Sequence, residues 1–266
     1  MNIINSKNNI KIKDLIRLRD DSKFRNDRSL FYVEGERILK DTPKELIEQI
    51  FIQESRYDEF KYITDNINDE KLFLVKDDIF FKIKDTINSQ GIIAIIKYCN
   101  LIDFDSTDFN NINKCLILDN INDPGNLGTI IRLAEATNID LIVMCNNCCS
   151  LFNTKVIRSC MSSIFRLKFY ISKDSIQDIN KLKSYGFKIY STVLNSNSMN
   201  FNSIQYNDKS ALIFGNEANG ICSDLINISD YNIHIPMCGK IESLNVAMAA
   251  TAVCYELMRQ NNYYEA

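Results

Sequence analysis

The sequence predicts a two-part α/β protein whose carboxyl-terminal part is built on a mostly parallel sheet. Three observations support this fold class. Short apolar, β-branched runs alternate with helical patterns along most of the 266 residues, which is typical of strands joined by crossover helices. A polar stretch at 100–113, rich in Asp and Asn, separates two such regions. In the second region, three polar segments that contain glycine follow predicted strands or open a helix.

The first region predicts a small α/β module. Apolar residues at helical spacing indicate an amphipathic helix over 8–24. A helix is expected from about Arg37 and another from Thr42-Pro43, because a capping residue before proline favours a helix start. Apolar runs predict strands at 30–33, 50–53, 72–75 and 91–97. The last of these is a continuous β-branched run and is expected to be buried.

The second region alternates strands and helices in the same way. A helix is expected at 129–137, and a long terminal helix at 243–259 with Ser243 as its N-cap. Strands are expected at 115–119, 140–144, 188–194 and 211–214. The predicted organisation is a first domain over residues 1–100, a linker over 101–113 and a second domain over 114–266. Ligands of such sheets bind at the carboxyl ends of the strands.

Composition excludes several classes of protein. Hydrophobic residues make up 45% and charged residues 24% of the chain, which is ordinary for a soluble globular protein. No stretch approaches the ~20 apolar residues that span a bilayer, and the amino terminus lacks the apolar core of a signal peptide. We therefore expect a cytoplasmic protein with no membrane partner.

The nine cysteines are scattered, and an odd number without a signal peptide favours free thiols over disulfides. The run Cys145-Asn-Asn-Cys148-Cys149 has the spacing of half a zinc site. A structural zinc usually needs four N or S ligands, but no second C-x-x-C exists and the only histidine, His234, lies far along the chain. We expect no metal, and we expect His234 to be a core or strand residue.

Charge is unevenly distributed along the chain. The formal net charge of −3 argues against a broadly basic nucleic-acid-binding protein. However, residues 1–28 hold eight Lys/Arg against four Asp/Glu, whereas residues 41–70 hold three against nine. The first predicted helix places Lys11, Lys13, Arg17 and Arg19 outside its apolar stripe. This stretch could meet RNA phosphates or form a solvated helix face, and charge alone favours neither.

Three short segments carry most of the chemical signal. They read N-L-G-T-I-I-R from Asn126, G-N-E-A-N-G from Gly215 and I-P-M-C-G-K-I-E-S-L-N-V from Ile235. Each mixes polar side chains with glycine, which lets the backbone approach a ligand closely. One such segment would mean little, but three in this order over about 120 residues are a specific signal.

These segments resemble the three motifs of the SpoU (TrmH) family of RNA ribose 2′-O-methyltransferases, within the SPOUT superfamily. They match N-x-G-x-x-x-R, G-x-E-x-x-G and I-P-M-x-G-x-x-x-S-L-N-V. Residues 155–167 resemble the family's linking segment, although Thr154 and Ser162 depart from its usual Pro and Gly. Residues 11–37 resemble the amino-terminal substrate-binding module of the ribosomal-RNA members.

The resemblance implies a fold and a reaction. The fold is a small α/β RNA-binding domain followed by a trefoil-knotted SPOUT domain that forms a homodimer. We expect Arg158 and the terminal helix near the dimer interface, where apolar surface would come from Leu244, Val246, Met248, Ala249, Val253 and Leu257. The reaction is methyl transfer from S-adenosylmethionine to a ribose 2′-hydroxyl of RNA, with 23S ribosomal RNA favoured. Catalytic residues by the resemblance are Asn126, Arg132, Glu217, Ser243 and Asn245. Cofactor-binding residues are Thr192, Leu194, Gly215, Gly220, Ile235, Met237, Gly239, Leu244 and Asn245.

The roles within this set stay open. Arg132 is a poor general base by itself. It could clamp the target phosphate bidentately, accept the proton with help from that phosphate, or be a surface arginine in an i,i+4 pair. Asn126 could hold Arg132, the ribose or the loop. Glu217 could orient either residue, brace its loop or cap a helix. Ser243 and Asn245 could bind an anion at a helix start or only cap the helix.

Three other functions are less consistent with the sequence. A dehydrogenase with a dinucleotide cofactor predicts G-x-G-x-x-G after the first strand of its domain, where this chain has Gly125-Asn-Leu-Gly128. A non-catalytic RNA-binding ribosome-assembly factor would not need all five catalytic residue types together. A transfer-RNA 2′-O-methyltransferase usually lacks so large an amino-terminal module.

Overall fold

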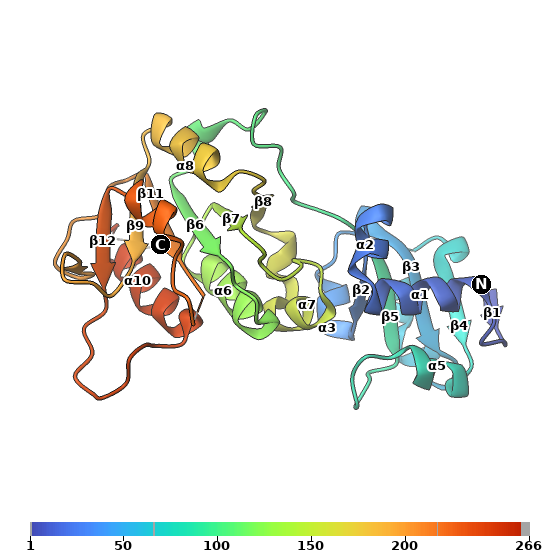
Figure 1. Cartoon of the computed structure of the whole chain (residues 1–266). Coiled ribbons are helices and arrows are strands. Elements are labelled where there is room, and N and C mark those ends of the chain that lie inside the picture. Colours follow the sequence, from blue (N-terminus) through green and yellow to red (C-terminus); the bar gives the residue numbers. More distant parts are fainter. Residues whose placement is uncertain (1, 66, 217, 262–266) are drawn as a thin grey trace. The chain divides into compact units, whose positions relative to one another are not determined.

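The computed structural model describes residues 2–65, 67–216 and 218–261 (Figure 1). The chain divides into two compact units. The first unit contains the residues up to Cys99 together with Ser150–Phe165, and the second contains Asn100–Cys149 and the residues from Arg166 onward. Among the described residues, no helix is long and apolar enough to cross a membrane.

Within the described residues, the first unit is built on five strands. They are β1 (Asn2–Ile4), β2 (Leu30–Glu34), β3 (Ile47–Gln53), β4 (Leu72–Val75) and β5 (Ile92–Lys97). The sheet order is β1-β4-β3-β5-β2. β4 pairs in parallel with β1 and β3, whereas β5 is antiparallel to β2 and β3. All of β5 except Lys97 is buried, as its β-branched sequence predicts.

Short helices surround this sheet. They are α1 (Ile10–Asp20), α2 (Ser22–Arg28), α3 (Glu36–Lys40), α4 (Lys61–Thr64), α5 (Asp77–Ile83) and α7 (Thr154–Cys160). Single 3₁₀ segments are η1 (Lys44–Leu46), η2 (Glu54–Phe60), η3 (Asp69–Lys71) and η5 (Met161–Phe165).

Two predicted helices of the first unit differ from the structure. The helix expected over 8–24 breaks at Asp21, which has an extended backbone. Its side chain accepts a hydrogen bond from Phe24 N at 3.1 Å and so starts α2. The helix expected from Thr42-Pro43 is only the turn η1, because β3 already begins at Ile47.

Residues 150–165 belong to the first unit, although the predicted boundary assigns them to the second domain. Phe152 is 2% exposed, and its ring centroid lies 3.8 Å from that of Tyr98 and 4.8 Å from that of Phe31. Arg158 forms an ion pair with Asp85. Aromatic packing and this ion pair therefore fix the segment within the first unit.

Within its described residues, the second unit contains seven strands. They are β6 (Lys114–Asp119), β7 (Leu141–Cys145), β8 (Lys168–Ile171), β9 (Lys188–Thr192), β10 (Met199–Asn200), β11 (Ser210–Phe214) and β12 (Tyr231–His234). The order is β10-β12-β9-β11-β6-β7-β8, and the paired strands are parallel. The predicted mostly parallel sheet is confirmed. The chain runs from β6 to β7 and β8 on one side, then returns to β9 on the other, so the order reverses beside β6.

Helices cover both faces of this sheet (Figure 1). They are η4 (Phe109–Asn111), α6 (Pro124–Ala136), α8 (Ser175–Ser184), α9 (Ser223–Asn227) and α10 (Val246–Gln260). On one face, Leu182 of α8 and Leu225 of α9 share a core with Ile117 and Ile213 of the strands. On the other face, α6 and α10 pack against each other.

Three expectations for the second unit differ from the structure. Helix α6 begins at Pro124 and not at 129, because Asp123 caps it by accepting from Asn126 N at 2.8 Å. The expected linker lies within the second unit, since Phe104 and Phe109 are buried in its core. Helix α10 begins at Val246 and is capped by the residue before it, not by Ser243.

Candidate active site

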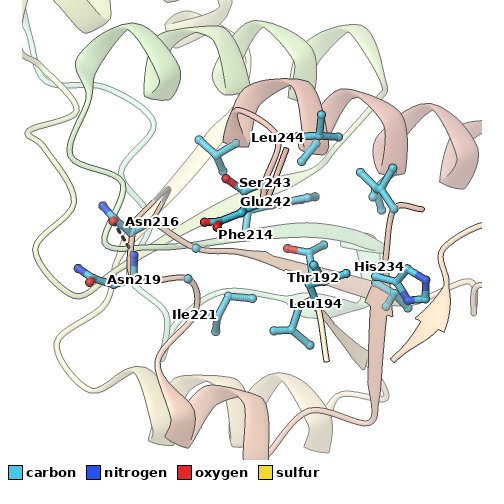
Figure 2. Close-up of a pocket in the computed structure, with 18 of the residues that line it drawn as sticks. Thr192, Leu194, Phe214, Asn216, Asn219, Ile221, His234, Glu242, Ser243 and Leu244 are labelled. Carbon is cyan, nitrogen blue, oxygen red and sulfur yellow. Dashed lines mark hydrogen bonds between the residues drawn. The ribbon is translucent and has the colours of Figure 1, made fainter. Parts of the chain in front are cut away.

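A cavity of about 360 Å³ lies at the carboxyl ends of β9, β11 and β12, beside the first turns of α10 (Figure 2). Leu194 follows β9, Phe214 ends β11 and Met237 follows β12, so each strand supplies part of the wall. Figure 2 shows Asn216 and Asn219 at one end of the cavity and the other labelled residues along it. The lining is mostly apolar with a few polar side chains, as in small-molecule sites generally.

Gly215 sits where no side chain fits. A Cβ at this position would lie 2.4 Å from the carbonyl carbon and oxygen of Gly220 and 2.5 Å from Ile221 N. The loop closes on itself, because Asn216 N donates to Gly220 O at 3.0 Å and Gly220 N donates to Asn216 O at 2.9 Å. Gly220 has a φ of +68°, a region that L side chains rarely adopt. The loop geometry therefore requires both glycines.

Side chains fasten this loop to the sheet. Asn216 Nδ2 donates to Asn120 O at 3.0 Å. Its Oδ1 accepts from the backbone N–H groups of the next two described residues, Ala218 at 2.9 Å and Asn219 at 3.2 Å. The cavity wall is thus held in shape by hydrogen bonds that do not involve a ligand.

Asp119, the last residue of β6, is 2% exposed and holds the far end of the same loop. One carboxylate oxygen accepts from Cys222 N at 2.7 Å, and the other accepts from Asn146 Nδ2 at 2.7 Å. Asp119 therefore ties the loops after β7 and β11 to β6.

The first and third motifs meet directly. Asn245 Nδ2 donates to Asn126 Oδ1 at 2.9 Å, although the two residues are 119 positions apart. Asn245 Oδ1 accepts from Ala247 N at 3.0 Å and Met248 N at 3.3 Å, and so caps α10. One side chain therefore joins α6 to the start of α10. The flanking residues of Asn245 line the cavity, but Asn245 does not.

Arg132 is exposed on α6 and does not line the cavity. It forms no hydrogen bond or ion pair with the residues that the structure describes. The predicted alternative of an i,i+4 pair finds no support there, because the nearest acid on the helix, Glu135, pairs with Arg166. The guanidinium of Arg132 is therefore available to an anion from solution.

The remaining predicted residues fall into three groups. Most of the predicted cofactor-binding residues line the cavity, and Ser243 lines it too: Thr192, Leu194, Gly215, Gly220, Ile235, Met237, Ser243 and Leu244. Gly239 and Asn245 do not line it. Glu217 lies outside the described residues.

Sequence reasoning missed several residues of this site. Phe214, Asn219 and Glu242 line the cavity, and Asn216 both lines it and shapes its loop. The signal for Asn216 was its place directly after a motif glycine. His234 ends β12 as expected of a strand residue, but it also lines the cavity, with Nδ1 3.0 Å from Ser198 Oγ.

The nine cysteines are free. Burial raises the pKa of Cys148 to about 11 and that of Cys145 to about 12, so both thiols remain protonated near neutral pH. Across the described ranges, no group of three or more His, Cys, Asp or Glu is arranged to hold a metal.

The comparisons with known proteins agree with this geometry. Residues 113–255 match the SpoU rRNA Methylase family, and residues 9–94 match the MRM3-like substrate binding domain. The 23S rRNA (guanosine(2553)-2'-O)-methyltransferase RlmP of Bacillus subtilis is 31% identical to the chain, over 97% of this chain and 99% of RlmP. The chain belongs to the SpoU rRNA methylase family.

Solved structures share the fold of this SpoU family member. An AdoMet-bound rRNA methyltransferase from Sinorhizobium meliloti has a TM-score of 0.84 at 23% identity, over 97% of each chain. The SpoU methyltransferase AviRb from Streptomyces viridochromogenes has a TM-score of 0.84 at 20% identity, over 96% of this chain and 99% of AviRb. The predicted family, the methyltransferase class and the α/β fold with a mostly parallel sheet are confirmed.

Proposed function

We propose that this SpoU family member methylates a ribose 2′-hydroxyl of 23S ribosomal RNA. The observation that carries the proposal is the bond between Asn126 and Asn245, which joins the first motif to the third at the edge of the cavity. A reaction centre needs acceptor-binding and donor-binding groups held in one geometry. The 31% identity to RlmP across nearly the whole chain supports the choice of 23S RNA.

The cavity suits S-adenosylmethionine as the methyl donor. Its volume of about 360 Å³ is that of a small-molecule site. The bare backbone at Gly215 allows close approach of a flat ring, and the backbone groups of Ile235, Met237 and Leu244 would bind its polar edge. Thr192 and Leu194 would form another wall. When bound, the cofactor supplies an already activated methyl group, so the protein contributes chiefly binding and orientation.

Arg132 would hold the RNA at the reacting hydroxyl. An exposed guanidinium without a partner among the described residues presents a planar fork that binds a phosphate through two parallel hydrogen bonds. The first turn of helix α6 contains Asn126, which accepts a hydrogen bond from Asn245. The same helix therefore carries both Arg132 and the contact to the third motif. Arg132 would thereby orient the target ribose relative to the cofactor.

The proposal includes a trefoil knot, a cytoplasmic location and a homodimer through the second unit. Of the six apolar residues expected to supply the dimer surface, Val246, Val253 and Leu257 are buried in the chain itself, and Leu244 and Ala249 line the cavity. Met248 is 64% exposed, and Tyr255, seven residues on, is 43% exposed. These two form an apolar face on α10 that a second copy would cover.

Sedimentation at micromolar concentration tests the dimer. We expect a mass of two chains for the wild type and a shift toward one chain for Met248→Glu with Tyr255→Glu. A wild type that remains monomeric would contradict this part of the proposal. Arg158, which was also expected near the interface, forms its ion pair with Asp85 inside the first unit.

Mapping ribose methylation in RNA from cells with and without the gene tests the function itself. We expect one 2′-O-methyl group to disappear from 23S ribosomal RNA when the gene is deleted. Loss from transfer RNA would support the transfer-RNA alternative. An unchanged methylation map together with defective ribosomal subunits would support the non-catalytic assembly factor.

A further inference from the structure

Two arginines of the first unit converge on one aromatic ring. The guanidinium carbon of Arg17, on α1, lies 3.8 Å from the ring centroid of Phe24, and that of Arg28, on α2, lies 5.4 Å from it. Phe24 is 6% exposed, so its ring is fixed in the core of the unit. Arg28 follows Phe24 by four residues, which places both on one side of α2. Guanidinium groups stack favourably on such rings, so both charges are held in place.

Two neighbouring arginines, Arg19 and Arg25, form hydrogen bonds within the protein. Arg19 binds Asp20 at 2.7 Å and donates to the carbonyl of Lys84 at 3.0 Å. Arg25 is buried and donates to the carbonyl oxygen of Leu18 at 2.8 Å. Arg19 lies outside the buried stripe of α1, as predicted, but its side chain joins α1 to the segment after α5.

Arg17 and Arg28 differ from these neighbours in the contacts of their guanidinium nitrogens. Both are exposed, and neither forms an ion pair or a hydrogen bond with the residues that the structure describes. Both guanidinium groups lie close to one ring, and like charges repel, so an anion that binds beside this ring would be attracted by both. Lys13, one helical turn before Arg17 and also exposed, extends the positive surface along α1.

We propose that Arg17 and Arg28 form a phosphate-binding site for the backbone of the RNA substrate, on the substrate-binding unit and outside the cofactor cavity. Arginine forks match phosphate oxygens bidentately, and contacts to phosphates fix an RNA in register without reading its sequence. This inference rests on the proposed function, which supplies the RNA. The first unit matches a substrate-binding domain, and the inference identifies Arg17 and Arg28 as two of its contacts with RNA.

The salt dependence of RNA binding tests the site. The full-length protein is titrated with a 23S ribosomal RNA fragment over a series of salt concentrations. For Arg17→Gln with Arg28→Gln, we expect the slope of log K against log salt to fall by about one to two, with about tenfold weaker binding at low salt. The matched control, Lys173→Gln with Arg259→Gln, removes two exposed charges from the second unit and should leave the slope nearly unchanged.

A second variant separates charge from geometry. Arg17→Lys with Arg28→Lys keeps both charges but loses the planar stack, so the slope should stay near that of the wild type while affinity falls by a few fold. Calorimetry with S-adenosylmethionine should give wild-type affinity for every variant, which shows that the second unit is intact, and thermal unfolding of each variant should show that the first unit is folded.

A wild-type slope and affinity for the double glutamine variant would overturn the phosphate site. That result would leave the proposed function intact if the wild type still methylates ribosomal RNA. Conversely, a wild type that binds RNA through these arginines but transfers no methyl group would contradict the proposed function and support the phosphate site.

Discussion

The cofactor cavity and the arginine pair are two binding sites built in opposite ways. The cavity is shaped by backbone, because the loop after β11 admits no side chain at Gly215 and is held by hydrogen bonds that do not involve a ligand. The arginine pair consists of two long, exposed side chains on α1 and α2. A backbone-shaped site restricts which residues its segments can contain, whereas many sequences would satisfy an exposed face. The first therefore leaves motifs in the sequence, and the second leaves only a local excess of charge.

The largest expected effect comes from filling the cavity wall. Gly215→Ala places a Cβ 2.4 Å from the backbone of Gly220, so the loop must open. We expect S-adenosylmethionine affinity to fall about a hundredfold or more, since such overpacking costs on the order of 3 kcal/mol.

Gly239→Ala is the matched control, because no atom lies within 4 Å of the added Cβ. Calorimetry should find its S-adenosylmethionine affinity within about threefold of the wild type, which corresponds to a difference in binding free energy below 1 kcal/mol. Equal affinities for Gly215→Ala and the wild type would show that the cavity is not backbone-shaped.

Weakening the hydrogen bonds that hold the loop after β11 should have a smaller effect on cofactor binding. Asp119→Asn replaces one acceptor oxygen by a donor, so one of the bonds from Cys222 N and Asn146 Nδ2 is lost. We expect a loss of about 1–3 kcal/mol in stability and roughly tenfold weaker cofactor binding, measured by thermal unfolding and calorimetry.

Asp140→Asn provides the comparison for that variant. Asp140 Oδ2 accepts from Asn113 N and Lys114 N at the opposite ends of the strands. A similar loss of stability should leave cofactor affinity unchanged. If both variants weaken the cofactor equally, the effect of Asp119 is general destabilisation and not loop positioning.

The two roles of Asn245 can be separated by substitution. Asn245→Ala removes the cap of α10 and the bond to Asn126, and should cost about 1 kcal/mol of stability. Asn245→Asp keeps the capping oxygen but loses the donor to Asn126. We expect Asn245→Asp to retain wild-type stability. Its rate of methyl transfer should fall about tenfold, which corresponds to an increase of roughly 1.4 kcal/mol in the activation free energy. Normal transfer by Asn245→Asp would mean that the contact between motifs serves only the fold.

The smallest effect concerns the thiols. With a pKa of about 11, Cys148 is thiolate in roughly one molecule in a thousand at pH 8. Iodoacetamide should therefore modify the exposed Cys222 and Cys238 first. Both are next to residues that line the cavity, so S-adenosylmethionine should slow their reaction, as peptide mass spectrometry would show. An unchanged rate at both would place the cofactor elsewhere.

Local sequence patterns predicted much of the fold. β4 matches its predicted bounds, and β11 extends one residue beyond them, because each is a compact apolar run. β1, β8, β10 and β12 were missed. β1 and β10 have only two or three residues, and β8 and β12 mix polar with apolar residues over four positions, unlike the wholly apolar β4. The start of α6 was placed five residues late, although Asp123-Pro124 has the residue types of a cap followed by a first-turn proline.

The sequence predicted only those parts of the site that lie within short contiguous segments. The motifs located the cavity, but Asn216 and Asp119 act through contacts 96 and 103 residues away in the chain. No periodicity reports such contacts. In the same way, the sequence shows eight basic residues before residue 29. Only the structure separates Arg17 and Arg28 from Arg19 and Arg25, whose charges the protein itself uses.

The central claim is that the cavity binds the methyl donor while Arg132 holds the RNA at the reacting hydroxyl. Single-turnover transfer of a tritiated methyl group to 23S ribosomal RNA fragments, with calorimetry on the cofactor, tests it most directly. For Arg132→Ala we predict transfer reduced by about 10²–10³ with cofactor affinity within about twofold of the wild type, less than 0.5 kcal/mol. Arg132→Lys should recover little, because it lacks the planar fork. Near-normal transfer by Arg132→Ala, or a defect confined to cofactor binding, would contradict the account.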